Sequence, residues 1–363
     1  MGWRCGIVGL PNAGKTTIFN ALTAARAEVA AYPFCTISPN TGVVPVPDAR
    51  LAQLGQLLKP ERLTPTTINF VDVAGLIAGA SKGEGLGNQF LGQIRETDLI
   101  VHVVRCFADG RCPHPLGGLD PVRDVEVVET ELMLADLEIL ERHRVKLEKR
   151  RKAGDKQADA ALNLTAKIEA GLNQGRWARD QGLTPTELAY LTEAPLLTLK
   201  PYIFVANISE AEFQGGPCLK ALEDLGRQRQ APVIPILGDL EAELLDLSPE
   251  EQKEFLQSLG LAEPGINRLI QESYRLLGLV TFYTIVGPEV RAWTVPAGTP
   301  APKAAGQVHS DMEKGFIRAE VMQFTDLARL GSGAKIKEAG LLAVEGRDHV
   351  VEDGEILLFR FQA

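Results

Sequence analysis

The strongest chemical signal in the sequence is a glycine-rich run near the N-terminus, Gly9-Leu-Pro-Asn-Ala-Gly14-Lys15-Thr16. It matches the pattern GxxxxGK[ST] and lies between a strand-like run and a helix-forming segment, which is the context that this pattern requires. In such a loop, backbone amides turn toward phosphate oxygens, Lys15 reaches the β- and γ-phosphates, and the Thr16 hydroxyl binds Mg²⁺. We therefore predict a nucleoside triphosphate site that contains Asn12, Ala13, Gly14, Lys15, Thr16 and Thr17.

Two further motifs provide ligands for the metal. The run Ile68-Asn-Phe-Val-Asp72-Val-Ala-Gly75 places Asp72 at the carboxyl end of a strand and Gly75 three residues later. A P-loop enzyme needs a carboxylate near Mg²⁺ there, followed by a backbone amide that senses the γ-phosphate. Thr36 lies between the two motifs and can offer a second hydroxyl, although alone it would be an ordinary loop threonine. The predicted metal ligands are Thr16, Thr36 and Asp72, and Gly75 is a predicted nucleotide contact.

A third motif concerns the base. Asn207-Ile-Ser-Glu210 follows a strand at the place where P-loop GTPases carry Asn-Lys-x-Asp, whose Asp accepts two hydrogen bonds from guanine. Ile208 replaces the Lys, and the longer Glu210 moves the carboxylate by one methylene group. A site built for paired hydrogen bonds discriminates poorly once they are lost, so we expect ATP to be preferred and GTP to bind more weakly. The predicted contacts in this region are Asn207, Glu210, Leu237 and Gly238.

The elements that must position these motifs alternate between strand-like and helical runs, before about residue 120 and again after residue 200. This alternation predicts an α/β fold, a P-loop G-domain with a mainly parallel sheet, formed by residues 1–123 and 197–278. The expected strands cover residues 4–8, 67–71, 99–104, 201–206 and 231–235. The expected helices cover residues 15–25, 88–95 and 219–228.

Two other regions interrupt or follow this pattern. Residues 124–196 show helical periodicity without strand signals, and we interpret them as an inserted antiparallel helical hairpin. Its first arm, residues 126–152, would be about 40 Å long and should project from the body. A fresh helix start is expected at Thr184-Pro185-Thr186-Glu187. Residues 279–363 contain strand-like runs and two short helical segments, which predicts a small α+β domain.

Composition limits the class of protein. With 363 residues, of which 45% are hydrophobic, the chain can bury the cores of two or three domains. We expect a cytoplasmic protein, because the sequence shows neither a signal peptide nor a stretch long enough to span a membrane. The five cysteines form no CxxC pair, which argues against a zinc ribbon or a disulfide framework.

A local basic patch contrasts with the net charge of −9, which excludes a uniformly basic nucleic-acid-binding protein. Residues 142–156 contain eight Lys or Arg side chains and no interleaved aromatic residue. Such a patch suits contact with an RNA phosphate backbone through shape and charge, while a solvated helical face is the alternative. The predicted RNA contacts are Arg142, Lys149, Arg150, Arg151 and Lys152.

Taken in order, these motifs resemble the YchF/Obg-like ATPase family of Obg-related, translation-factor-class GTPases, and the resemblance covers essentially the whole chain. The C-terminal segment, with Arg291-Ala-Trp-Thr-Val and His309-Ser-Asp-Met-Glu-Lys-Gly-Phe316, looks like a TGS domain, which is a β-grasp module. The resemblance implies ATPase activity favoured over GTPase activity, dependence on Mg²⁺ and K⁺, and a regulatory role in translation or stress. We expect the protein to be a monomer. It also implies the ribosome as partner, through the large subunit and its ribosomal RNA. An Asn at the position of Asn12 helps related enzymes to hold K⁺, although it can also simply shape the loop.

Hydrolysis should be slow without help. Ras-like enzymes place a water-orienting Gln where this chain has Leu76, which has no polar group for that task. The resemblance implies a catalytic role for His114, whose imidazole can orient or deprotonate water, and a solvent-exposed loop histidine is the alternative. Two other functions remain open at this point. One is a GTPase of the Obg type, and the other is a nucleic-acid-binding module with nucleotide as a structural ligand.

Overall fold

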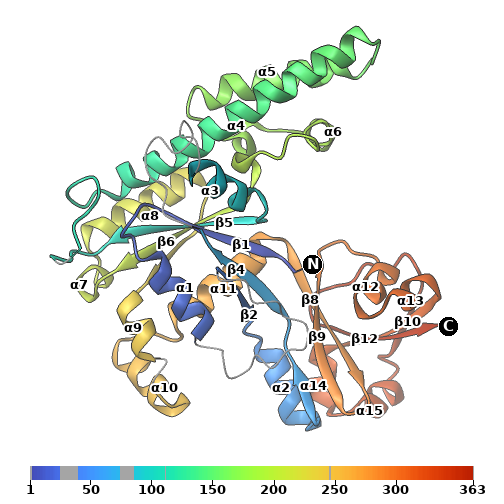
Figure 1. Ribbon diagram of the computed structural model, residues 1–363. Helices are drawn as coiled ribbons and strands as arrows, with labels where there is room; N and C mark the ends of the chain where they lie inside the picture. The colour runs from blue at the N-terminus through green and yellow to red at the C-terminus, as the bar shows by residue number, and fades with distance from the viewer. Residues whose placement is uncertain (1, 25–39, 74–85, 111, 245–246, 363) are drawn as a thin grey trace. The chain divides into compact units, whose positions relative to one another are not determined.

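The computed structural model describes residues 2–24, 40–73, 86–110, 112–244 and 247–362 (Figure 1). The chain divides into two compact units, which we describe separately. Unit 1 consists of Met1–Val43 and Asn69–Leu269, and unit 2 consists of Val44–Ile68 and Ile270–Ala363. No helix of the described residues combines the length and the apolar character needed to span a membrane.

The described residues form a six-stranded sheet, most of which belongs to unit 1, with the order β2-β4-β1-β5-β6-β7. From β4 to β7 along this order, neighbouring strands are parallel. Every residue of β5 and β6 is buried, as expected for central parallel strands that are covered on both faces. The strands are β1 (Arg4–Val8), β2 (Thr41–Pro45), β4 (Thr67–Asp72), β5 (Leu99–Cys106), β6 (Tyr202–Ile208) and β7 (Val233–Ile236).

Helices cover both faces of this sheet. Figure 1 shows α4 and α8 on one face and α1 and α9 on the other. The core beneath α4 and α8 joins Val128 and Leu132 of α4 to Phe204 of β6 and Leu222 of α8. The helices of unit 1 are α1 (Lys15–Ala24), α3 (Leu86–Arg95), α4 (Pro121–Lys152), α5 (Ala158–Leu172), α6 (Pro185–Tyr190), α7 (Glu210–Phe213), α8 (Pro217–Arg229), α9 (Gly238–Glu243), α10 (Pro249–Ser258) and α11 (Gly265–Leu276), the last of which ends in unit 2.

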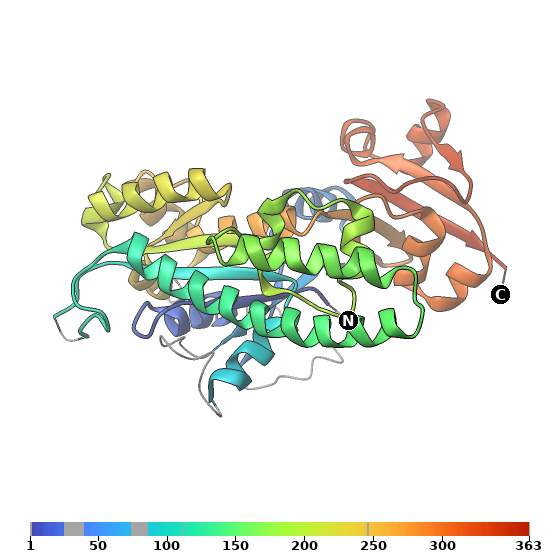
Figure 2. The same cartoon turned by 90° about the horizontal axis from the view of Figure 1, so that it is seen from above.

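The helices α4 and α5 form an antiparallel hairpin, and Figure 2 shows them running side by side. The helix α4 begins at Pro121, five residues before the predicted start, because the Asp120 side chain caps it by accepting from the Arg123 amide. Leu140 of α4 packs with Leu164 and Ile168 of α5 in the core of the hairpin. The predicted helix start near Thr184 is confirmed, since α6 has a complete capping box.

Unit 2 is a mixed six-stranded sheet with the order β11-β10-β12-β8-β9-β3. The adjacent residues Phe282 and Tyr283 of β8 point to opposite faces, and each face has its own core. The helices α12 (Ala301–Val308) and α13 (Ser310–Lys314) cover one face, and α2 (Ala49–Leu58), α14 (Phe324–Leu330) and α15 (Gly333–Glu338) cover the other. The strands are β3 (Arg62–Thr64), β8 (Leu279–Val286), β9 (Glu289–Pro296), β10 (Phe316–Gln323), β11 (Ala343–Glu345) and β12 (Glu355–Phe361).

Unit 2 differs from the sequence-based prediction in two ways. After residue 278 its described part has four short helices, α12 to α15, where two helical segments were expected. Residues 44–68, which we expected in the nucleotide-binding domain, cluster with the C-terminal sheet instead. Their strand β3 pairs in parallel with β9, and Leu51 and Leu54 of α2 pack with Tyr283. The burial of these leucines requires partners more than 200 residues away, which no local pattern announces.

Candidate nucleotide-binding site

The glycine-rich loop connects β1 to α1 at the carboxyl edge of the unit 1 sheet. Two of its glycines are required by geometry, because each has a positive φ, +151° at Gly9 and +90° at Gly14. A Cβ on Gly9 would lie 2.3 Å from the Val103 carbonyl oxygen, and a Cβ on Gly14 would lie 2.0 Å from Asn207 Nδ2. Asn12 also has a left-handed backbone, with φ of 64°, a conformation that Asn tolerates better than most residues. Asn12 therefore shapes the turn, as one of its two expected roles requires.

The predicted metal ligands of the described residues lie together. Thr16 Oγ1, at the start of α1, donates to Asp72 Oδ2 at the end of β4 over 3.0 Å. Burial raises the pKa of Asp72, while the hydrogen bond from Thr16 and the charge of Lys15 lower it. A hydroxyl and a carboxylate are hard oxygen donors of the kind that Mg²⁺ takes in P-loop enzymes, so this pair fits the ion. Thr36, Gly75 and Leu76 lie outside the described residues.

Lys15 is buried, with 8% of its surface exposed, at the base of the glycine-rich loop. Its ammonium donates to the carbonyl of Leu10 over 2.9 Å. Burial lowers the pKa of Lys15, and the nearby carboxylate of Asp72 raises it. The loop thus keeps a cation among backbone dipoles at the edge where phosphate groups bind in this class of fold.

Asn207 connects the predicted base-binding motif to the glycine-rich loop. Its Nδ2 donates to the carbonyl of Ala13 over 3.0 Å. A Cβ on Gly238, the first residue of α9, would lie 2.8 Å from Asn207 Oδ1, so only glycine fits there without displacing the amide. The predicted contacts Ala13, Asn207 and Gly238 are therefore brought together. The buried Leu237 immediately precedes Gly238, at the start of α9.

The other predicted base contact has a different environment. Glu210 is exposed in the first turn of α7, three residues after Asn207. Ile208 is buried, with 4% of its surface exposed, and belongs to the core below the sheet edge. Its side chain is thus packed among apolar residues of unit 1, whereas the lysine that it replaces in GTPases packs over the base.

A residue that the sequence analysis missed links the glycine-rich loop to the next loop. Arg105, near the end of β5, is buried and donates to the carbonyl oxygens of Asn12 over 3.4 Å and of Cys112 over 2.8 Å. Its guanidinium also lies 4.6 Å from the ring centroid of Phe107. A charged residue in a mostly apolar strand was the available signal for this role.

His114 lies in the loop between β5 and α4, and its side chain is only 6% exposed. Its Nε2 lies 2.7 Å from Asp124 Oδ2, and the amide of Leu116 donates to its Nδ1 over 3.2 Å. The expectation of a solvent-exposed histidine is therefore not what the structure shows. Because Nδ1 accepts a hydrogen bond, the neutral ring carries its proton on Nε2 and donates it to Asp124.

The predicted RNA contacts lie along the second half of α4, where Arg142 and the run Lys149–Lys152 are exposed. Arg150 forms an ion pair with Glu193 over 2.7 Å, and Arg151 lies 3.9 Å from Asp159. Four basic residues in the last turn also interact favourably with the dipole of the helix. Helix stabilisation therefore accounts for part of this charge.

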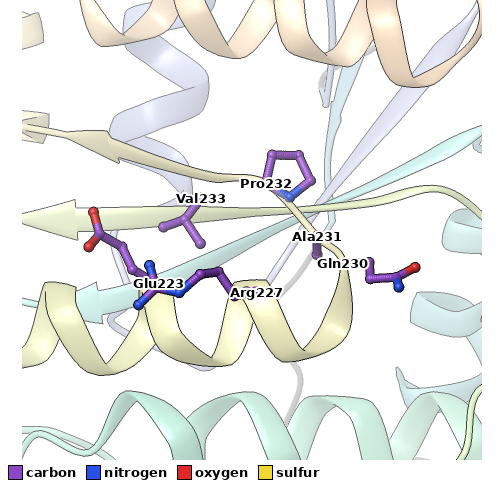
Figure 3. Close-up of a pocket in the computed structure, with 7 residues that line it drawn as sticks. Glu223, Arg227, Gln230, Ala231, Pro232 and Val233 are labelled. Carbon is purple, nitrogen blue, oxygen red and sulfur yellow. The ribbon is translucent and has the colours of Figure 1, made fainter.

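A hollow of about 420 Å³ lies elsewhere in unit 1, between the end of α8 and the start of β7 (Figure 3). In Figure 3, Glu223 and Arg227 project from α8, while Pro232 and Val233 belong to the strand side. This is the amino end of β7, whereas the residues around Gly238 follow its carboxyl end. The hollow is therefore separate from the candidate nucleotide site. Its lining residues are Glu223, Gly226, Arg227, Gln230, Ala231, Pro232 and Val233.

Comparison with known proteins adds independent findings. Residues 4–145 match a family model described as "50S ribosome-binding GTPase", and residues 279–362 match the YchF-GTPase_C model, described as "Protein of unknown function (DUF933)". The chain is 51% identical to the "Ribosome-binding ATPase YchF" of Haemophilus influenzae, over 99% of each chain. It is 44% identical to the protein of that name in Bacillus subtilis, over 99% of this chain and 100% of the relative.

Solved structures agree with these relatives. The structure of the Schizosaccharomyces pombe YchF GTPase aligns with a TM-score of 0.90 and 33% identity, covering 99% of this chain and 98% of that one. A GTP-binding protein from Pyrococcus horikoshii aligns with a TM-score of 0.63 at 20% identity, over 99% of this chain and 100% of that one, which supports the fold alone. The predicted P-loop G-domain fold is thereby confirmed.

Proposed function

The chain belongs to the YchF family, and from that premise we propose that it is an Mg²⁺-dependent ATPase that binds the ribosome. The observation that carries the hydrolytic part is the contact between Thr16 and Asp72 beside the buried Lys15. These three side chains come from two elements that meet at the carboxyl edge of the sheet, where P-loop enzymes bind the β- and γ-phosphates and their metal.

In the proposed reaction, the backbone amides of the glycine-rich loop and Lys15 hold the phosphate chain, and Thr16 and Asp72 hold Mg²⁺. The bound ion would neutralise charge that develops on the transferred phosphoryl group. The Lys15 ammonium has three N–H donors, so it can bind the phosphates while it still donates to the Leu10 carbonyl. Asn207 keeps the base-binding region fixed to the glycine-rich loop, so that base and phosphates are held in one frame.

The preference for ATP over GTP is supported by the residues that depart from the guanine-reading motif. Ile208 is buried in the core and Glu210 carries the longer side chain, so neither provides the contacts of Asn-Lys-x-Asp. The curated relatives named above are called ATPases. A GTPase of the Obg type is the second candidate, because the matched N-terminal model is described as a GTPase.

Two further features belong to the proposal. Asn12, with its side chain at the surface of the glycine-rich loop, is the residue that would help to hold a stimulating K⁺. His114 is the residue that would position the attacking water, since Leu76 has no polar group for this purpose. Unaided hydrolysis should therefore be slow, which suits a regulatory enzyme in translation.

The ribosome-binding part of the proposal is supported by the names of the relatives and by the basic run at the end of α4. We expect ribosomal RNA of the large subunit to contact Lys149, Arg150, Arg151 and Lys152, together with Arg142. Because such contacts neutralise phosphates, affinity should fall steeply with rising salt. Replacing Lys149 and Lys152 with Glu should weaken cosedimentation with ribosomes and flatten this salt dependence.

The experiment that tests the proposal uses Lys15→Ala, with Lys220→Ala on the exposed side of α8 as the matched control. We expect Lys15→Ala to abolish ATP hydrolysis while Lys220→Ala leaves it intact. Ribosome cosedimentation is then measured with and without ATP. Binding that depends on ATP in the control and loses this dependence in Lys15→Ala supports a regulatory cycle. Ribosome binding that is independent of ATP in both variants would instead favour a nucleic-acid-binding module in which nucleotide is a structural ligand.

A further inference from the structure

The first turn of α4 holds the loop that contains His114. Asp120 caps this turn, and Arg123 and Asp124 extend from it toward residues 114–118. The Arg123 guanidinium donates to three successive backbone carbonyls of the loop, those of Leu116 at 3.4 Å, Gly117 at 3.0 Å and Gly118 at 3.1 Å. These contacts define a clasp made of Arg123 and Asp124.

Asp124 binds Arg123 and His114 at the same time. Its Oδ1 accepts from Arg123 Nη2 over 3.0 Å, and its Oδ2 accepts from His114 Nε2 over 2.7 Å. The carboxylate is buried, with 3% of the residue exposed. Both oxygens of this buried carboxylate accept hydrogen bonds, one from a guanidinium and one from an imidazole N–H. These bonds offset the cost of burying the charge and stabilise the observed loop conformation.

In this conformation neither ring nitrogen of His114 is available to hydrogen-bond a water molecule. Its Nε2 is taken by Asp124, its Nδ1 accepts from the Leu116 amide, and the ring is almost completely buried. A residue that orients or deprotonates water needs a ring nitrogen within hydrogen-bond distance of that water. Any such role of His114 therefore requires that its bond to Asp124 or to Leu116 be broken.

The start of the same loop is fastened to the glycine-rich loop instead. Asn12 Nδ2 donates to the carbonyl of Pro113 over 3.2 Å, and Arg105 Nη2 donates to the carbonyl of Cys112 over 2.8 Å. His114 thus follows directly after a residue that contacts the phosphate-binding loop. Only the part of the loop beyond Pro113 has to leave the clasp for the imidazole to turn toward that loop.

The clasp itself is anchored in the core. Val125 and Val128, which follow Asp124 on α4, are completely buried in the main hydrophobic core of unit 1. Residues 115–118, in contrast, are all exposed. The element that changes position is therefore the loop, and α4 provides the fixed side of the contact.

We propose that Arg123 and Asp124 are positioning residues that store His114 in a resting conformation, and that release of His114 from them precedes each hydrolytic event. This inference rests on the proposed function, in which His114 acts on the attacking water. It adds a regulatory step to that function, because the fraction of molecules with His114 released sets the rate of hydrolysis without ribosomes.

The test compares ATP turnover of the full-length wild type with Asp124→Asn and Arg123→Gln. Loss of a hydrogen bond to a charged group shifts an equilibrium about tenfold or more, here toward the molecules in which His114 is released. Each variant should therefore raise kcat about tenfold. The matched control is Glu126→Gln, the same loss of charge on an exposed residue of α4 next to the clasp, and its kcat should stay at the wild-type value. His114→Ala, alone and combined with Asp124→Asn, should reduce hydrolysis to the same low rate.

A second measurement keeps the test independent of turnover. The imidazole ¹⁵N shifts of His114 should report the Nε2–H tautomer in the wild type and tautomer averaging in Asp124→Asn. Exchange of the Leu116 and Gly117 amides, which donate to His114, should accelerate in both clasp variants. A kcat that stays unchanged or falls in Asp124→Asn and Arg123→Gln, while His114→Ala is inactive, would overturn the resting-state inference but leave the proposed function standing. If His114→Ala hydrolyses ATP at the wild-type rate, the proposed role of His114 fails and the inference fails with it.

Discussion

The carboxyl group of Glu241 offers a sharp test of how α9, which begins at the predicted base contact Gly238, is held in place. Glu241 lies in α9, which begins at Gly238, and only 6% of its surface is exposed. Its Oε1 accepts from the amides of Gly265 over 2.6 Å and Ile266 over 3.3 Å, at the start of α11. Burial raises the pKa of Glu241 to about 7, and these two hydrogen bonds oppose the rise without cancelling it.

The sign of the pH dependence follows from this raised pKa. Between its ordinary pKa of 4.5 and about 7, Glu241 holds more protons in the folded than in the unfolded state. Its contribution to stability is therefore present at low pH and is lost as the pH rises through this window. A difference of about 2.5 pH units corresponds to about 3 kcal/mol, at about 1.4 kcal/mol per unit.

We predict that Glu241→Gln removes this loss, because the amide oxygen can still accept from Gly265 while no charge is buried. The free energies of unfolding of the two proteins should be similar near pH 4.5. The variant should then become more stable than the wild type by about 3 kcal/mol at pH 8. Urea unfolding followed by circular dichroism at several pH values measures this difference. A difference in unfolding free energy that does not change with pH would refute the reasoning. So would a wild type that becomes more stable relative to the variant as the pH rises.

Three further predictions concern the site and its supports. Gly14→Ala should lower ATP affinity about tenfold or more in a calorimetric titration. Gly14 has a φ of +90°, and a Cβ there would lie 2.0 Å from Asn207 Nδ2, so there is no room for the alanine side chain. An unchanged affinity would count against this geometry. Asp72→Asn should raise the Mg²⁺ concentration for half-maximal ATPase activity about tenfold, and an unshifted Mg²⁺ titration would remove Asp72 from the metal site. Asp120→Ala should cost about 1 kcal/mol of unfolding free energy, because α4 loses its N-cap, and urea denaturation without any shift would show that the cap contributes nothing.

Much of the fold could be predicted from the sequence because the signals are local. The strand Arg4–Val8 was predicted at its observed bounds, since an apolar run is followed directly by glycine-rich turn chemistry. The capping box of α6 requires only Thr184 and Glu187, three residues apart, and both hydrogen bonds are present. The glycine-rich loop could also be predicted from local sequence, because its function depends on backbone geometry that its own glycines determine.

Contacts between distant segments could not be predicted in this way. Arg105 binds carbonyl groups of two loops, one of which is 93 residues away, and a single charged residue in a strand does not reveal such partners. The pairing of His114 with Asp124 depends on the start of α4, which we placed five residues too late. The packing of residues 44–68 against the C-terminal sheet depends on a strand pairing separated by more than 200 residues. Periodicity says that a face is buried but not which element covers it.

The central claim, that this site binds ATP in preference to GTP for hydrolysis, is tested most directly by a competition titration. A fluorescent ATP analogue bound to the wild-type protein in the presence of Mg²⁺ is displaced with ATP and, separately, with GTP. Since neither Ile208 nor Glu210 supplies the guanine contacts, ATP should displace the probe at clearly lower concentration than GTP. Tighter binding of GTP than of ATP would contradict the account and make the chain a GTPase.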